Sequence, residues 1–184
     1  MSFKDWNLTK SLLAALDELG VQEPTAVQTA VFSPAMAGKN LHVLAPTGTG
    51  KTWAYVLPVI RMWQFSSPRR IQTLVIVPTI ELVEQVVQSF NQLSVGVDFK
   101  TIGVSGVGNI KTQVQEIRNG ADVLVGTPGR LKDLILNGHV NPRYVKRIIL
   151  DEVDQLMRMG FRNDTMQCMD AIPARRQELL FSAT

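Results

Sequence analysis

The chain has 184 residues, of which 45% are apolar and 19% are charged, and its formal net charge is +3. These proportions are those of an ordinary globular domain, so they exclude a disordered tail, a collagen-like rod and a coiled coil. The sequence also lacks the run of ~20 apolar residues that a membrane helix needs, and its polar start is unlike a secretory signal.

The apolar residues recur with periods that predict an alternation of helices and short strands. Helical spacing covers 8–19, 24–37, 50–64, 80–93, 110–119 and 131–137, and short apolar runs at 41–44, 73–77, 97–104, 122–125, 147–150 and 178–181 are the expected strands. Two short helices are expected before the last strand. Strands that are apolar on both faces and separated by helices indicate an α/β fold, a mostly parallel sheet flanked by helices in three layers. Ligands of such sheets bind beyond the carboxyl ends of the strands.

A glycine-bearing loop follows the first expected strand and leads directly into a helix. It reads Ala45-Pro46-Thr47-Gly48-Thr49-Gly50-Lys51-Thr52, which departs from the P-loop pattern only at Ala45. Backbone N–H groups at a helix start bind phosphate oxygens, and glycines let the backbone approach them closely. Lys51 is expected to reach the β- and γ-phosphates, and the Thr52 hydroxyl to ligate Mg²⁺. The loop therefore predicts a nucleotide-phosphate site formed by Thr47, Gly48, Thr49, Gly50, Lys51 and Thr52.

An acidic cluster follows the fifth expected strand, where Asp151, Glu152 and Asp154 stand within four residues. Carboxylates at the end of a buried strand are costly without a balancing positive charge, and Mg²⁺ carried by a nucleotide would supply one. We expect Asp151 to hold the metal through water and Glu152 to orient and deprotonate the attacking water. Acidic residues also favour helix starts, so the combination with the P-loop is what indicates hydrolysis, with Glu152 and Lys51 as catalytic residues.

Two other classes of P-loop protein are excluded by missing motifs. The Asn-Lys-x-Asp motif of guanine-specific proteins does not occur in the sequence, and neither does the arginine-rich lid of a nucleoside kinase. The small net charge also means that any contact with a nucleic-acid backbone must rely on local groups, including backbone amides.

Further short motifs flank the P-loop and the acidic cluster. Phe3, Gly20, Pro24-Thr25 and Gln28 precede the P-loop, and residues 151–154 read Asp-Glu-Val-Asp, a variant of D-E-A-D. Together these residues resemble the amino-terminal RecA-like domain of the DEAD-box ATP-dependent RNA helicases, over nearly the whole chain. In that family the early residues form the Q motif, whose glutamine amide hydrogen-bonds adenine because an amide both donates and accepts. The resemblance thus implies that Phe3, Thr25 and Gln28 take part in ATP binding.

Loops after three other expected strands extend the resemblance. Pro78-Thr79 is similar to motif Ia, Ser105-Gly106 to the Gly-Gly element, and residues 127–130 to motif Ib. In the family these loops grip the RNA backbone without reading its sequence. The resemblance implies RNA binding by Pro78, Thr79, Gly106, Thr127, Gly129 and Arg130. For Arg130, contact with phosphate and bracing of its own loop are both open.

The last three residues, Ser182-Ala183-Thr184, resemble motif III, which links hydrolysis to strand separation in the family. The resemblance implies that the hydroxyls of Ser182 and Thr184 hydrogen-bond the acidic cluster, with Asp154 as the expected partner.

The sequence departs from the family pattern at four positions. Val153 replaces the alanine of D-E-A-D, Ile80 replaces the arginine of P-T-R-E-L, Ser105 replaces the first glycine of the Gly-Gly pair, and Val21 stands at a usual aromatic position. We expect none of these residues to touch phosphate or metal. ATP binding therefore follows more directly from the sequence than RNA binding does.

The resemblance implies an ATP-binding motor domain that uses ATP and Mg²⁺ and couples hydrolysis to RNA clamping and duplex unwinding. Residues 1–184 form one such domain, with the Q-motif region at 1–28. Family members also need a second RecA-like domain, which supplies arginine fingers, so we expect a piece of a longer protein that is nearly inactive alone. The single cysteine, Cys168, cannot form an internal disulfide, which favours a reducing compartment and a cytoplasmic location.

Two other functions stay open at the level of sequence. One is a non-catalytic module that binds RNA or a partner and retains only the helicase fold. The intact set of Lys51, Thr52, Asp151 and Glu152 argues against that module. The other is a DNA-directed motor of the same superfamily, which Gln28 and Pro24-Thr25 disfavour.

Overall fold

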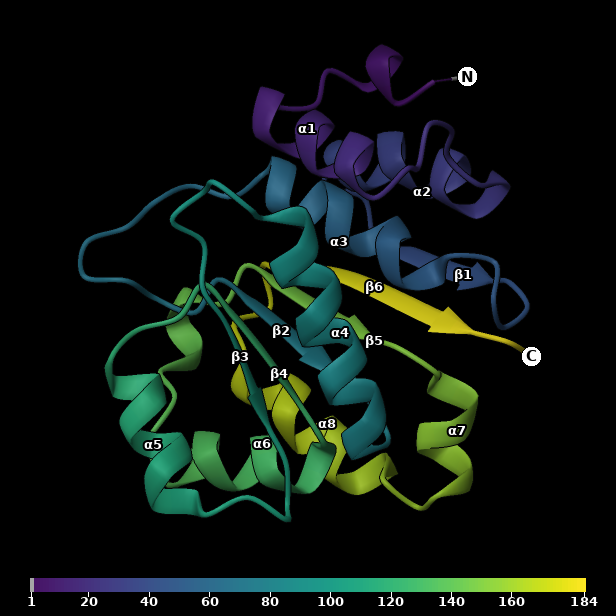
Figure 1. Cartoon of the computed structure of the whole chain (residues 1–184). Helices are drawn as coiled ribbons and strands as arrows, with labels where there is room; N and C mark the ends of the chain where they lie inside the picture. The colour runs from purple at the N-terminus through teal and green to yellow at the C-terminus, as the bar shows by residue number, and fades with distance from the viewer. Residues whose placement is uncertain (1) are drawn as a thin grey trace.

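A computed structural model describes residues 2–184, and its centre is one six-stranded sheet (Figure 1). The strands run in the order β1-β6-β5-β2-β4-β3, and every neighbouring pair is parallel. Their bounds are Leu41–Leu44 for β1, Thr73–Ile76 for β2, Thr101–Val104 for β3, Val123–Gly126 for β4, Arg147–Leu150 for β5 and Gln177–Ser182 for β6. The predicted parallel α/β sheet is confirmed.

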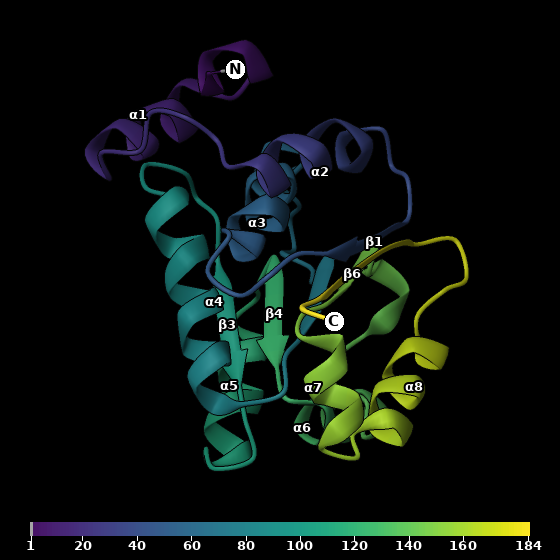
Figure 2. The ribbon, with the colours of Figure 1, turned by 90° about the vertical axis from the view of Figure 1, so that its right-hand side faces the viewer.

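Helices cover both faces of the sheet and complete three layers (Figures 1 and 2). One side carries the 3₁₀ turn η1 (Phe3–Trp6) and the helices α1 (Lys10–Glu18), α2 (Ala26–Met36), α3 (Lys51–Arg61) and α4 (Ile80–Leu93). The other side carries α5 (Ile110–Arg118), α6 (Pro128–Leu136), the turn η2 (Pro142–Tyr144), α7 (Val153–Arg158) and α8 (Arg162–Ala171).

Two hydrophobic clusters, one on each face, hold the layers together. Side chains of a strand point alternately to its two faces, so Val75 joins the cluster beneath α3 and α4, and Leu74 joins the cluster beneath α5, α6 and α8. Ile149 and Ile148 of β5 divide in the same way. Four-residue strands with both faces buried read as unbroken apolar runs, which is why the sequence revealed them.

The first strand differs from the expectation that every strand is buried on both faces. Leu44 of β1 is 74% exposed, and His42 is exposed on the same face. The physical reason is position, because β1 lies at the edge of the sheet and α2 and α3 cover only one of its faces.

Several element boundaries differ from those predicted, for identifiable local reasons. The third strand begins at Thr101 instead of 97, because a turn joins Val97 N–H to the Ser94 carbonyl. Helix α6 begins at Pro128, three residues before the predicted start, because proline is well suited to the first turn of a helix. Helix α2 begins after Thr25, whose hydroxyl caps it.

The strand order decides which loops meet at the carboxyl edge. Strand β6 lies between β1 and β5, with Ser182 beside Leu44 and Leu180 beside Leu150. The end of β6 is therefore flanked by the glycine-bearing loop on one side and the acidic cluster on the other. The loops after β2, β4 and β3 meet on the other half of the sheet.

Candidate active site

The glycine-bearing loop needs glycine at two of its positions. Gly48 and Gly50 have φ of +84° and +90°, a region that side chains with a Cβ rarely adopt. A Cβ on Gly50 would also lie 2.6 Å from Gln28 Nε2. Within the loop, the Thr49 hydroxyl donates to the Pro46 carbonyl at 2.7 Å. The loop is thus shaped by backbone geometry, and Gly50 leads directly into α3.

Lys51, the first residue of α3, is buried against the acidic cluster. Its Nζ lies 3.0 Å from Glu152 Oε1, and the two side chains are 6% and 16% exposed. Within residues 2–184 the ammonium has this ion-pair contact but no partner with hydrogen-bond geometry. A buried cation beside a loop of turned backbone N–H groups fits a phosphate, so the residues present match the predicted nucleotide.

Glu152 has an unusual backbone conformation at the end of β5. Its φ and ψ are +52° and +53°, in the left-handed region that glutamate rarely occupies. This conformation turns the chain abruptly from β5 into α7 and brings the carboxylate to Lys51. Local strain of this kind persists where the surrounding structure enforces it, and it clusters at functional sites.

Asp151 is almost fully buried and both its carboxylate oxygens are hydrogen-bonded. Oδ2 accepts from the Tyr55 hydroxyl at 2.8 Å, and Oδ1 accepts from the Glu152 backbone N–H at 3.0 Å. Burial raises the pKa of Asp151 to about 6, although the Tyr55 hydrogen bond opposes this shift. Asp151 is therefore a desolvated carboxylate that gains from a nearby positive charge.

Tyr55 contacts the acidic cluster, and sequence reasoning did not identify it. It is fully buried in α3, and burial together with the charge of Asp151 raises its pKa well above the ordinary value. The hydroxyl therefore stays protonated and donates to Asp151. Its ring packs against Phe181 of β6, with centroids 5.2 Å apart. The signal in the sequence was weak, because Tyr55 stands in an apolar helix and reads as a core residue.

The residues after β6 contact the acidic cluster through Asp154. Thr184 Oγ1 donates to Asp154 Oδ2 at 3.3 Å, and Ser182 Oγ donates to the Thr184 carbonyl at 2.7 Å. Desolvation acts to raise the pKa of Asp154, but the polar groups at the end of β6 and the charge of Arg158 outweigh it and lower the pKa. Asp154 is therefore an ionised carboxylate that joins α7 to the end of β6.

Thr25 and Gln28 connect the start of α2 to the glycine-bearing loop. They form a capping box in which Gln28 Oε1 accepts from the Thr25 N–H at 2.9 Å. Gln28 Nε2 also donates to the Gly50 carbonyl at 3.3 Å. Each amide atom retains the capacity for one more hydrogen bond, so the side chain can hold the loop and a ligand together.

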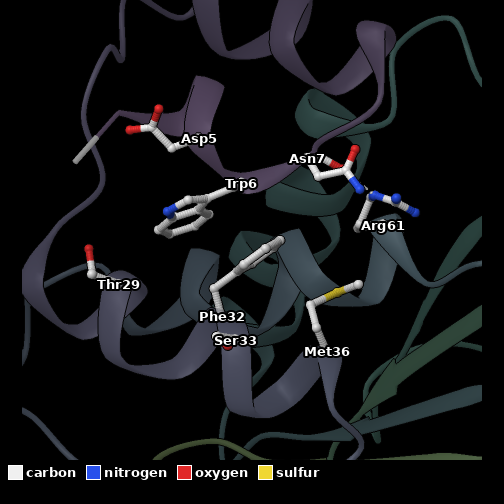
Figure 3. A pocket seen from close by; sticks show the side chains of 8 residues that line it. All are labelled: Asp5, Trp6, Asn7, Thr29, Phe32, Ser33, Met36 and Arg61. Atoms are coloured by element: carbon white, nitrogen blue, oxygen red, sulfur yellow. Dashed lines mark hydrogen bonds between the residues drawn. The ribbon is translucent and has the colours of Figure 1, made fainter.

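Phe3 is separated from the glycine-bearing loop. It packs edge-on against Trp6. The Trp6 indole in turn stacks on Phe32, with ring centroids 4.3 Å apart (Figure 3). Phe3 lines a cavity of about 290 Å³ with Val21. Thr25 instead lines one of about 480 Å³ that includes Ala45, Pro46 and Thr49. The structure thus brings Thr25 and Gln28, but not Phe3, to the glycine-bearing loop.

The six residues predicted to bind RNA line one cavity of about 590 Å³. These are Pro78, Thr79, Gly106, Thr127, Gly129 and Arg130, from the loops after β2, β3 and β4. Thr127 precedes α6 without using its hydroxyl as a helix cap, so that hydroxyl is free to donate. Ile80, Glu81 and Asp133 also line the cavity. The two carboxylates outnumber the one cation, Arg130, so the net charge of the lining is slightly negative.

Arg130 braces its neighbouring loop. One terminal nitrogen donates to Gln113 Oε1 at 2.7 Å and to the Gly108 carbonyl at 3.1 Å. The other donates to the carbonyls of Gly106 and Gly108, both at 3.1 Å. Of the two roles that the sequence left open for Arg130, the structure shows bracing.

The protein side chains alone do not complete a metal site. In the described part of the chain, no group of three or more His, Cys, Asp or Glu side chains could hold a metal ion. A metal would have to share its ligands with a bound nucleotide, and the Thr52 hydroxyl and Asp151 remain the donors that the sequence predicts for it. None of the described helices is long and apolar enough to cross a membrane.

The parallel sheet and the phosphate loop that caps β1 place the chain among the RecA-like P-loop domains. The sequence profile of the DEAD/DEAH box helicase family matches residues 25–184. The chain belongs to this family, and the resemblance inferred from the sequence is confirmed.

Similar proteins of known name cover the whole chain. It is 36% identical to DEAD-box ATP-dependent RNA helicase 9, mitochondrial, of Arabidopsis thaliana, over 100% of this chain and 31% of that protein. It is 37% identical to DEAD-box ATP-dependent RNA helicase CshA of Streptococcus pneumoniae serotype 4, over 100% and 35%. A crystal structure of a DEAD box protein from Methanococcus jannaschii matches with a TM-score of 0.95 and 34% identity, over 100% of this chain and 50% of that one. The chain thus spans about a third of the length of these curated relatives.

Asp151→Asn is expected to stabilise the nucleotide-free chain near neutral pH. The pKa of about 6 lies above the ordinary 3.8, so folding favours the protonated carboxyl, and the free energy of unfolding falls as pH rises between these two values. A shift of this size corresponds to ~3 kcal/mol at about pH 7.5, and the gain should shrink towards about pH 4.

Denaturant unfolding of the wild type and of Asp151→Asn at the two pH values measures this effect. Asp154→Asn is the matched control, because the lowered pKa of Asp154 predicts destabilisation at neutral pH. A gain for Asp151→Asn that is equal at both pH values would contradict the account.

Proposed function

We propose that this chain is the ATP-binding motor domain of an ATP-dependent RNA helicase, which couples ATP hydrolysis to RNA clamping and duplex unwinding. The observation that carries the proposal is the meeting of three loops at adjacent strand ends. Lys51 after β1, Glu152 after β5 and Thr184 after β6 are joined through the Lys51–Glu152 ion pair and the Thr184–Asp154 hydrogen bond. A change at the phosphate site would therefore be felt directly at the end of β6.

The residues of the phosphate loop would act in a definite order when nucleotide binds. Backbone N–H groups of Gly48 to Thr52 bind the phosphates, and Lys51 exchanges the Glu152 carboxylate for a phosphate oxygen. Glu152 is then free to accept a proton at its carboxylate from the attacking water. ATP would supply the bond to be cleaved, and Asp151 and Thr52 would hold Mg²⁺, which would supply positive charge.

The Q-motif residues would select the adenine base. Gln28 is buried and already donates a hydrogen bond to the Gly50 carbonyl. An adenine that takes up the remaining hydrogen-bonding capacity of the amide would therefore be linked to the phosphate loop through Gln28. Thr25 lies beside the same loop. Phe3, in η1, would form the far side of the adenine site. This role requires the base to extend beyond the glycine-bearing loop.

The cavity of about 590 Å³ would hold the sugar–phosphate backbone of RNA without regard to sequence. Its donors are the hydroxyls of Thr79 and Thr127 and the backbone amides near Gly106 and Gly129, at the start of α6. Arg130 contributes by fixing the loop that carries Gly106. Ile80 provides no charge where the family pattern has arginine, so this half of the site depends on neutral donors.

We also propose that a second RecA-like domain of the same protein completes both sites and supplies arginine fingers. The greater length of the relatives supports this proposal. We expect a cytoplasmic location, which is consistent with the single, buried Cys168, whose pKa burial raises to about 12. The isolated domain is expected to bind nucleotide but to hydrolyse it negligibly.

Gln28→Ala is expected to abolish the preference for adenine. Titration of the chain with Mg-ADP, Mg-ATP and Mg-GTP should show that the wild type prefers adenine nucleotides. The variant should lose about tenfold in affinity for them, the value of a hydrogen-bonding group removed from a buried site. Gln115→Ala, on the exposed side of α5, is the matched control. Equal binding of adenine and guanine nucleotides by the wild type would contradict the assignment of Gln28.

Glu152→Gln separates a motor from a non-catalytic module that retains the fold. In the longer protein that contains this chain, we expect RNA-stimulated ATP turnover to fall by about 10² to 10⁴, the typical contribution of a general base, while nucleotide binding is retained. A non-catalytic module would have no turnover to lose. Replacing RNA by DNA in the same assay tests the alternative of a DNA-directed motor, for which DNA would stimulate turnover equally.

A further inference from the structure

A further cavity lies at the opposite edge of the sheet from the proposed ATP and RNA sites. It has a volume of about 360 Å³ and lies between the long loop that joins α3 to β2 (Figure 1) and the segment of η2 that leads into β5. Gln72 and Lys146, which line it, immediately precede β2 and β5. The proposed function makes no use of this cavity.

Every charged residue that lines the cavity is basic. Arg70, Arg143 and Lys146 line it, and none of the three forms an ion pair with an acidic residue of the described chain. Lys146 Nζ donates to Oε1 of the neutral Gln72 amide, at 3.3 Å. The cavity beside β2, β3 and β4 contrasts with this one, because Glu81 and Asp133 line it and Arg130 is occupied by carbonyls. Of these two cavities, the one at the amino edge is therefore the one lined by basic side chains without an acidic partner in the described chain.

Two aromatic rings are exposed at the same place. Phe65 is 60% exposed and Tyr144 is 40% exposed. The Arg70 guanidinium stacks over the Tyr144 ring, with its central carbon 3.8 Å from the centroid, which fixes the ring as a flat platform. The hydroxyl of Ser66 is buried in this loop without a hydrogen-bond partner among residues 2–184. Stacking surfaces, unpaired cations and unused polar groups therefore converge on one cavity.

We propose that this cavity is a second contact site for single-stranded RNA. Arg70, Arg143 and Lys146 bind its phosphates, and a base stacks on Phe65 or Tyr144. Basic side chains combined with exposed aromatic rings are the usual means of binding a single strand without sequence preference. An acidic protein segment would use the cations but has no bases to stack on the rings. The site goes beyond the proposed function, because it lies outside the RNA cavity formed after β2, β3 and β4.

Charge removal with a matched control tests the proposal. Binding of a fluorescent oligo-uridine to the chain is measured by anisotropy at several salt concentrations, without nucleotide. The triple variant Arg70→Gln, Arg143→Gln, Lys146→Gln should lose about tenfold in affinity, and the slope of log K against log salt should become shallower by about 2. The control triple Lys10→Gln, Lys39→Gln, Arg118→Gln removes the same charge from exposed positions outside the cavity. Equal losses in the two triples would overturn the proposal.

The aromatic contribution is tested separately. Phe65→Leu and Tyr144→Leu keep apolar side chains but remove the stacking surface, and each is expected to weaken binding about fivefold.

Cross-linking with 4-thiouridine RNA should label the segments 62–72 or 141–147, and the labelling should persist in Thr127→Ala. Labelling confined to the loops after β2, β3 and β4 would overturn the second site without affecting the first. Displacement of the RNA by polyglutamate beyond the effect of salt alone would overturn it in favour of an acidic protein partner.

Discussion

The ion pair between Lys51 and Glu152 is the contact on which the organisation of the active site depends. It joins the loops after β1 and β5, which the intervening β6 keeps apart in the sheet. Asp151, directly beside it, is a desolvated carboxylate that accepts hydrogen bonds from the Tyr55 hydroxyl and one backbone N–H. Removal of one partner from a buried ion pair leaves an uncompensated charge. Glu152 therefore balances the charge of Lys51 within the protein itself. In the proposed function, a bound phosphate would replace the Glu152 carboxylate as the partner of Lys51.

The order of the strands divides the carboxyl edge into two connected halves. The β1, β6 and β5 half carries the phosphate loop, the residues of motif III and the acidic cluster, while β2, β4 and β3 carry the loops that line the second half. Strand β5 connects the two halves, because β2 pairs with it directly. Two sets of contacts connect the acidic cluster to β6. Tyr55 donates to Asp151 and packs against Phe181, and Asp154 accepts a hydrogen bond from Thr184.

Much of this arrangement could be predicted from the sequence, for physical reasons that differ between residues. Strands such as β2 and β4 are buried on both faces and give unbroken apolar runs. Gly48 and Gly50 indicate a phosphate loop, because residues with a Cβ rarely adopt their backbone conformation. The hydrogen bond of Tyr55 to Asp151 could not be predicted, because its position in α3 has the same apolar period as the core. The bracing by Arg130 required the distances to the Gly106 and Gly108 carbonyls, which depend on tertiary structure. The exposed face of Leu44 likewise follows from the place of β1 at the sheet edge, which no local pattern reveals.

The affinity of Glu152→Gln for Mg-ADP, compared with that of the wild type, tests most directly the claim that Lys51 exchanges a carboxylate for phosphate. Loss of the competing carboxylate should make ADP binding about fivefold tighter, which corresponds to ~1 kcal/mol. Asp154→Asn removes a nearby negative charge that does not contact Lys51, and it should leave the affinity within about twofold of the wild type. Tighter binding by Glu152→Gln alone is the result that the account predicts. Unchanged or weaker binding by Glu152→Gln, or an equal gain in both variants, would contradict it.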